Sequence, residues 1–187
     1  MRYAQDHKAQ THQRILTEAA ARFRRDGIGA TGLQPLMKAL GLTHGGFYAH
    51  FKSKDDLVEK ALRCAVDESR ERTAPVFAEE NALEKYIDMY LSESHRSNPD
   101  KGCPLPTMSS ELGQRGQPSP TTDELIQARL ASFKNSLSGP DAEAQSIMML
   151  STMVGALMLS RSVQDPELSD RILATARECL KKTPSEA

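Results

Sequence analysis

The residues whose types and spacing best suit chemistry lie between Gly41 and Leu57. A turn, Gly41-Leu42-Thr43, is followed by two adjacent glycines, two histidines, a tyrosine and then two lysines. Each glycine costs a helix about 1 kcal/mol relative to alanine. This cost needs a reason, and a close approach of the helix backbone to DNA at Gly45-Gly46 is a good one. Hydrogen-bonding and cationic side chains around such a thin face favour contact with the base edges and phosphates of DNA.

Helical spacing assigns the side chains of this segment to different faces. At about 100° per residue, Phe47 and Phe51 share one face, which predicts core packing, and the glycines lie away from it. The predicted DNA contacts are Thr31, Gln34, Thr43, His44, Gly45, Gly46, Tyr48, His50, Lys52 and Lys54. Of these, Lys52 and Lys54 would bind phosphate together with the N–H groups that begin the following helix. In the alternative interpretation, Tyr48 is a further core aromatic residue and the histidines are surface groups.

The elements that must position these residues are expected to be helices. Apolar residues recur at helical spacing over residues 7–26 and again over residues 33–40, and a third short helix is expected at residues 44–50. Two short helices joined by a tight turn predict a helix-turn-helix, in which the second helix enters the major groove. The expected helix starts are a capping box at Thr31 and Gln34, caps at Thr43 and Ser53, and a capping box at Thr121 and Glu124. The helix that begins after Ser53 should fade before Pro75.

The remainder of the chain is also expected to be helical. Its 187 residues are 39% hydrophobic, and Ala and Leu far outnumber Val and Ile, which favours helices over sheets. Further helices are predicted near residues 83–91, 104–112, 121–137, 140–163 and 166–182. The predicted fold class is therefore all-α, with nine helices.

Charge, cysteines and hydropathy restrict the partners. Residues 1–60 hold 10 Lys and Arg against 6 Asp and Glu, whereas residues 61–187 hold 14 against 19. A basic head on an acidic body favours a polyanion as partner of the head. The three cysteines have no metal-ligand spacing, so we expect no metal site and no cofactor. The longest apolar stretch, residues 147–159, is too short for a membrane span, and the first residues do not resemble a signal peptide, so we expect a cytoplasmic protein without membrane contact.

The segment from Gly41 to Leu57 closely resembles the signature of the TetR family of bacterial transcriptional regulators. That signature combines a Gly-Leu-Thr turn, two small residues, an apolar residue and a tyrosine with a Ser-Lys-acid cap ending in leucine. The resemblance is specific over about residues 10–65 and looser over the rest of the chain. Leu36-Met37 replaces the Ile-Ala pair common in the family's second helix, which keeps the packing.

The resemblance implies an organisation that periodicity alone does not give. Residues 1–54 would form a DNA-binding helix-turn-helix domain, and residues 55–187 a domain for effector binding and dimerisation. The chain would be a homodimer on a palindromic operator in double-stranded DNA, associated with the bacterial nucleoid. The last two helices would form the dimer interface, because the helix near residues 140–163 is apolar nearly all round and must be covered on both sides.

The body holds candidates for an effector site. Cys103 follows Lys101 at the start of a predicted helix, and both features favour a reactive thiolate. The segment around it is similar to one in a cysteine-containing branch of the family represented by NemR, which implies a response to electrophiles or oxidants. The effector or redox candidates are Cys103, Tyr90, Met108, Phe133, Met149 and Met153. The alternative is that all six are core residues.

The function expected from these features is sequence-specific regulation of transcription rather than enzymatic activity. The regulator would be a repressor released by a small-molecule or electrophile effector, with activation left open. One alternative is a thiol-dependent enzyme that uses Cys103, with His95 as the single histidine of the body. Another is a DNA-binding protein that is independent of any effector.

Overall fold

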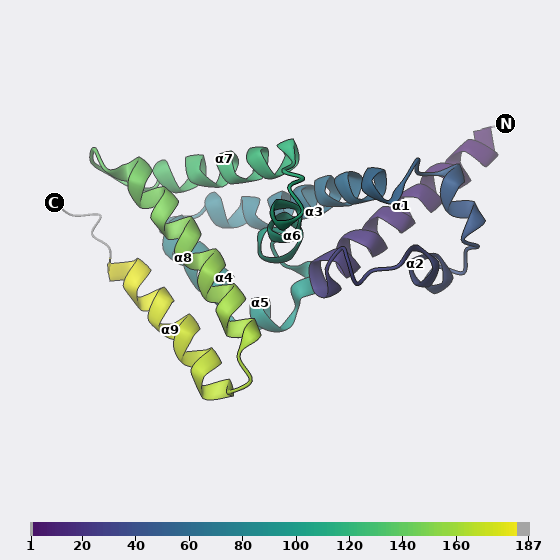
Figure 1. Ribbon diagram of the computed structural model, residues 1–187. Helices are drawn as coiled ribbons and strands as arrows, with labels where there is room; N and C mark the ends of the chain where they lie inside the picture. Colours follow the sequence, from purple (N-terminus) through teal and green to yellow (C-terminus); the bar gives the residue numbers. More distant parts are fainter. Residues whose placement is uncertain (1, 183–187) are drawn as a thin grey trace. The chain divides into compact units, whose positions relative to one another are not determined.

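The computed structural model describes residues 2–182 and the side chains from residue 6 to residue 182. Over these residues the chain is all-helical, with nine α-helices and no strand, as the sequence predicts (Figure 1). The α-helices are α1 (Arg2–Asp26), α2 (Leu33–Ala39), α3 (Lys54–Phe77), α4 (Ala82–Tyr90), α5 (Glu93–Ser97), α6 (Ser110–Gln114), α7 (Pro120–Lys134), α8 (Ala142–Ser162) and α9 (Pro166–Lys182). Shorter helical turns form η1 (Gly45–Ala49), η2 (Pro99–Lys101) and η3 (Leu105–Ser109).

Several helix starts are those expected from the sequence, and two are not. Ser53 Oγ accepts the N–H of Asp56 at 3.1 Å and caps α3, as predicted. The capping box at Thr31 and Gln34 is wrong, because the Thr31 hydroxyl donates to the carbonyl of Gly27 at 2.7 Å and Gly32 precedes α2. The box at Thr121 and Glu124 is also wrong, since Ser119 Oγ accepts the N–H of Thr121 at 3.1 Å.

Pro75 lies inside α3, contrary to the expectation that the helix fades before it. The helix continues for two more residues to Phe77. The N–H of Ala78 donates to the carbonyl of Pro75 at 3.2 Å and closes the last turn. A proline this close to a helix end removes one backbone bond without disrupting a long helical segment.

The chain packs as two compact units. The first holds the described residues up to Glu68 together with Asp100–Thr121, and the second holds Ser69–Pro99 with the described residues from Thr122 onwards. The first unit therefore contains α1, α2, η1, most of α3, η3 and α6. The division predicted after residue 54 concerns function and remains a prediction.

The first unit has a core formed by α1, α2 and the start of α3. Ile15 and Phe23 of α1, Leu36 of α2, Phe47 of η1 and Leu57 of α3 are fully buried. η3 packs against α1, and η3 and α6 pack on each other. A segment far away in the sequence thus completes the core of the amino-terminal head.

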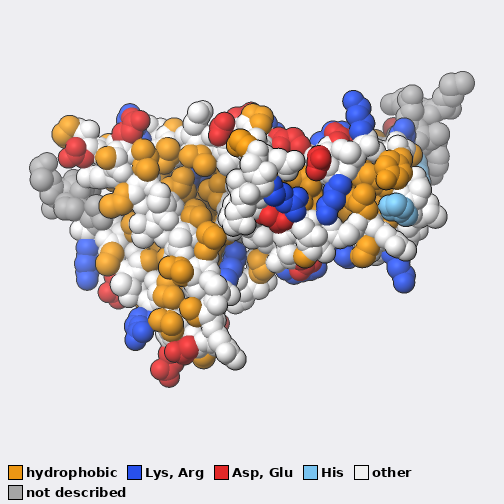
Figure 2. Space-filling view, in the orientation of Figure 1, with side chains coloured by type: hydrophobic (Ala, Val, Ile, Leu, Met, Phe, Trp, Pro, Cys, Tyr) orange, Lys and Arg blue, Asp and Glu red, His pale blue; other side chains and the backbone are white. Residues whose placement is uncertain are grey.

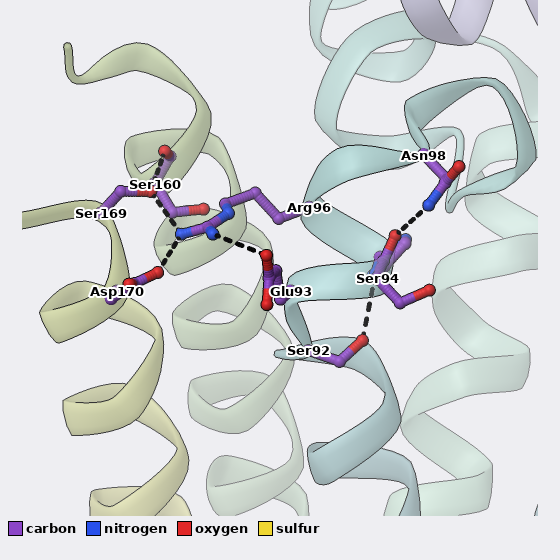
Figure 3. A network of polar contacts seen from close by, with 9 residues as sticks. Ser92, Glu93, Ser94, Arg96, Asn98, Ser160, Ser169 and Asp170 are labelled. Atoms are coloured by element: carbon purple, nitrogen blue, oxygen red, sulfur yellow. Dashed lines mark hydrogen bonds and ion pairs between the residues drawn. The ribbon is translucent and has the colours of Figure 1, made fainter. Parts of the chain in front are cut away.

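The second unit is built around α8 and α9, which pack side by side. Arg96 of α5 links to this pair, since its guanidinium donates to Ser169 Oγ at 2.8 Å and to Asp170 Oδ1 at 2.6 Å (Figure 3). Ser169 Oγ in turn donates to the carbonyl of Ser160 on α8 at 2.6 Å. Arg161 of α8 donates from Nε to the carbonyl of Arg96 at 3.0 Å. These contacts fix the short α5 to both carboxy-terminal helices.

Candidate nucleic-acid interface

The helix-turn-helix predicted from the sequence is present in the first unit. α2 ends at Ala39, a turn follows, and η1 begins at Gly45. Thr43 Oγ1 accepts the N–H of Gly46 at 3.2 Å, so Thr43 caps the second helix as expected. That helix is a 3-10 helix rather than the expected longer α-helix: the N–H of Phe47 reaches the carbonyl of His44, three residues back. Two glycines in five residues weaken α-helical propensity enough to account for this difference.

One side of η1 is fixed to the core of the head by aromatic rings. Phe47 is fully buried and Phe51 is nearly so, which confirms the face predicted by helical spacing. The two rings stack with centroids 5.4 Å apart, and the His12 ring of α1 stacks on Phe51 at 4.5 Å. Lys60 Nζ lies 5.5 Å from the centroid of the Phe51 ring. This stack holds the short helix in one orientation.

The opposite side of η1 is exposed. Tyr48 has an exposed fraction of 61%, although its ring meets the rings of Phe47 and His44 edge-on at 5.2 Å and 5.9 Å. A Cβ built on Gly45 would meet no described heavy atom within 4 Å, and the φ angle of Gly45 is not positive. Nothing in the described chain therefore requires glycine at position 45. A close approach from outside the chain is the remaining physical reason for it.

Lys52, two residues before α3 begins, adds a cation next to η1. Lys52 is exposed, and its backbone N–H donates to Asp56 Oδ2 at 3.0 Å. Asp56 also pairs with Lys60 at 2.9 Å. The Lys52 N–H and then the Lys60 ammonium hold the pKa of the Asp56 carboxyl below its ordinary value. Lys52 therefore offers its ammonium to the outside while its backbone is fixed.

Not all the predicted DNA contacts face outwards. Lys54 Nζ donates to the carbonyl of Ile28 at 2.7 Å, and burial, followed by the charge of Arg115, lowers its pKa. Thr31 is buried. His50 is half-buried, and burial and then Lys8 lower its pKa. Gln34 and His44 are exposed.

Sequence reasoning missed Glu111, the residue that joins α6 to the turn between α1 and α2. Its carboxylate accepts the N–H groups of Ile28 at 2.6 Å and Gly29 at 2.7 Å, and it pairs with Arg115. Gly27 has a φ of +89°, and a Cβ there would lie 3.0 Å from Glu111 Oε2. Only the closely spaced Gly27 and Gly29 hint at this contact in the sequence.

The structure places the effector candidates in both units. Cys103 and Met108 are buried in the first unit, whereas Tyr90, Phe133, Met149 and Met153 are buried in the second. In the second unit the Tyr86 ring connects two of them, with centroids 5.7 Å from Tyr90 and 5.5 Å from Phe133. Cys103, expected to be reactive, has an exposed fraction of only 8%. The six residues therefore do not share a single packed core.

The histidine and the other two cysteines of the body have distinct environments. His95 Nδ1 lies 2.7 Å from the carbonyl oxygen of Tyr90, and burial lowers its pKa to about 4. Burial and then the charge of Glu68 raise the pKa of the Cys64 thiol, while Cys179 is exposed. Within residues 2–182, no cluster of three His, Cys, Asp or Glu side chains is arranged to hold a metal ion. One helix of this range, α8, is long and apolar enough to cross a membrane, a property it shares with core helices of bundles.

A capped helix-turn-helix with one exposed face, within an all-helical fold, defines this chain as a helix-turn-helix protein. Residues 15–61 match the family model of bacterial regulatory proteins of the tetR family. The chain is 44% identical over 48 residues to the HTH-type transcriptional regulator AcrR of Shigella flexneri. The matching segment is 26% of this chain and 22% of that protein. It is 36% identical over 59 residues to the HTH-type transcriptional repressor KstR2 of Mycolicibacterium smegmatis, covering 32% and 29% respectively. These matches span less than half of the length of the curated relatives.

Solved structures share the fold over nearly the whole chain. A TetR transcriptional regulator from Chloroflexus aurantiacus superposes with a TM-score of 0.74 and 23% identity, covering 97% of this chain and 98% of that one. The reduced form of Escherichia coli NemR gives a TM-score of 0.77 and 17% identity, covering 95% and 99%. Residues 15–61 therefore match the amino-terminal domain of the tetR family, and the chain has the fold of these solved TetR-type structures.

Proposed function

We propose that the protein is a sequence-specific DNA-binding repressor that acts in the cytoplasm as a homodimer. The observation that carries the proposal is the exposed side of η1, where the Tyr48 side chain is exposed and Gly45 has no side chain to cover the backbone. Aromatic and hydrogen-bonding groups on a short helix suit the major groove, and Lys52, just before α3, suits a phosphate. The repressor role is supported by the name of the relative KstR2.

An apolar face on α8 supports the homodimer. Ile147, Met148, Met158 and Leu159 are large apolar residues with exposed fractions of 38–58%. Residues 147 and 158 lie 11 positions apart, so they share one side of an α-helix. Figure 2 shows hydrophobic side chains gathered over this part of the molecule. A second copy of α8 would cover this face and would place two heads on the half-sites of a palindrome.

The segment Asp100–Thr121 offers a route from the effector to the head. It carries Cys103, and it packs in the same unit as the helix-turn-helix. Glu111 in this segment accepts two backbone N–H groups beside the start of α2. An effector, or an electrophile that modifies Cys103, would favour a conformation in which this contact is broken and the head no longer fits its operator.

Selection of bound fragments from a random pool of double-stranded DNA tests the proposal. We expect enrichment of a palindrome whose half-sites are about one helical turn apart. Recovery of unrelated or single half-site sequences would contradict sequence-specific binding by a dimer.

Repeating the selection with N-ethylmaleimide tests the thiol route. We expect the reagent to release the enriched fragments from the wild type and from Cys179→Ser, a control that removes an exposed thiol. Cys103→Ser should stay bound. If Cys103→Ser is released as readily as the wild type, the effector is not an electrophile that acts at Cys103.

A further inference from the structure

Arg129 of α7 is a buried cation enclosed by aromatic rings in the second unit. Its exposed fraction is 8%. The guanidinium carbon lies 4.5 Å from the centroid of Tyr86 and 5.1 Å from that of Phe77. Nη2 donates to Thr73 Oγ1 at 3.3 Å. We refer to Arg129, Thr73, Phe77 and Tyr86 as the Arg129 box.

The described contacts of Arg129 include no counter-charge, in contrast to those of Arg24 and Arg96. Arg24 is equally buried, but it pairs with Glu68 at 2.6 Å, and Arg96 pairs with Asp170 at 2.6 Å. The contacts that the described residues give Arg129 are a hydroxyl and two rings, and no carboxylate is among them. Aromatic faces attract a cation without neutralising it, and buried charges in proteins are normally paired. The box is therefore suited to receiving an anion.

A cavity with both apolar and polar walls lies next to the box. Its volume is about 430 Å³, within the usual range for sites that bind small molecules. The apolar side chains that line it are Phe77, Ala82, Leu83, Ile87, Leu137, Met149 and Leu180. Phe77 belongs to both the cavity wall and the Arg129 box. The charged residues at the cavity are Glu79, which is paired with Lys85 at 2.6 Å, Lys181, which is paired with Asp88 at 2.5 Å, and Glu84.

We propose that the cavity and the Arg129 box together bind an amphipathic carboxylate. The apolar part of the ligand fills the cavity, and its carboxylate pairs with the Arg129 guanidinium after the Phe77 side chain turns aside. A charge-assisted, two-point contact of this kind is the strongest that arginine makes with a carboxylate. The ligand's role as an effector rests on the regulatory function proposed above, whereas its binding does not.

Calorimetric titration of the 187-residue protein, without DNA, tests the binding. The probes are decanoate and decan-1-ol, which share the same chain and differ in charge. We expect decanoate to bind at least about 10-fold more tightly than decan-1-ol, because only decanoate can pair with Arg129. Arg129→Gln should bind the two probes equally, and Arg129→Lys should restore part of the preference. Arg171→Gln, which removes an exposed arginine from α9, should behave as the wild type.

Two further outcomes decide the proposal even if Arg129→Gln does not fold. Leu137→Trp fills the cavity and should weaken both probes. If the wild type binds neither probe, or binds both equally, the proposal is wrong. If decanoate binds but does not release the selected operator, the binding site is confirmed and its role as an effector site is wrong. Failure of the protein to bind DNA at all would contradict the proposed function and leave the titration result unchanged.

Discussion

His95 shows how a single half-buried side chain responds to pH in this protein. Its ring meets Tyr90 edge-on at 4.6 Å, and its Nδ1 lies 2.7 Å from the Tyr90 carbonyl oxygen. Burial lowers its pKa from 6.5 to about 4, a shift that the backbone contact opposes and Arg161 reinforces. The folded protein therefore keeps the imidazole neutral over a pH range in which the unfolded chain protonates it.

The stability that His95 contributes is complete above pH 6.5 and is lost as the pH falls toward 4. From pH 7 to pH 5 the loss is about 2 kcal/mol of unfolding free energy, at ~1.4 kcal/mol per pH unit below 6.5. Urea unfolding at both pH values should show His95→Gln losing less stability than the wild type by this amount. His7→Gln, which alters an exposed histidine of α1, is the control. An unchanged pH dependence in His95→Gln would contradict this account of the ring.

At the residue scale, the sequence predicted which side chains of η1 are buried and which are exposed, because this depends only on helical spacing. The burial of Phe47 and Phe51 and the exposure of Gly45 follow from helical periodicity, and the structure has them so. The inward turn of Lys54 could not be predicted, because its partner carbonyl belongs to Ile28, 26 residues earlier. Likewise, Arg129 gave no signal in the sequence, since its box is assembled from α3, α4 and α7.

At the element scale, the turn between α1 and α2 depends on α6. Glu111 accepts the N–H groups of Ile28 and Gly29, and the close approach is possible because Gly27 and Gly29 have no side chain. Thus a short helix from the middle of the chain fixes the element that leads into the helix-turn-helix.

Glu111→Gln should lower the unfolding free energy by about 1–3 kcal/mol, because a neutral amide is a weaker acceptor and its nitrogen cannot accept. Amide hydrogen exchange at Ile28 and Gly29 should become faster in the same variant. Glu80→Gln, at an exposed position, should leave both measurements as in the wild type. Slow exchange at Ile28 and Gly29 in Glu111→Gln would show that the contact is not what holds this turn.

The helices themselves could be predicted because their apolar residues recur regularly, whereas some of their caps could not. Thr31 and Thr121 have the spacing of capping residues, but each hydroxyl has a different partner in the fold. Thr31 donates to Gly27, and Thr121 donates to Glu59 at 2.6 Å, 62 residues away. A threonine hydroxyl does not cap a helix where the fold gives it another hydrogen-bond acceptor.

At the scale of the whole molecule, the sequence predicted the family fold but not the path of the chain between its packing units. The fold follows from the apolar periodicity and from the family signature at residues 41–57. The return of Asp100–Thr121 to the amino-terminal unit could not be predicted, because it depends on contacts such as Glu111 with Ile28, 83 residues apart.

The exposed apolar face of α8 gives a prediction for the assembly. Leu159→Glu places a charge on the proposed dimer interface, where burial without a partner is costly. Sedimentation should then show a monomer where the wild type sediments as a dimer. Ala131→Glu, at an exposed position of α7, should remain dimeric. A wild type that is monomeric at all concentrations would contradict the proposed assembly.

The exposed side of η1 is the basis of the proposed function, and Gly45→Leu tests it most directly. The structure leaves open space around a side chain at position 45, and equally at Gly113 on α6, so both leucine variants should fold. Binding to the selected operator, measured by fluorescence anisotropy, should weaken at least about 10-fold in Gly45→Leu, because the added side chain separates the helix from the groove. Gly113→Leu should bind as the wild type. Equal affinity of Gly45→Leu and the wild type would show that this face of η1 does not enter the groove.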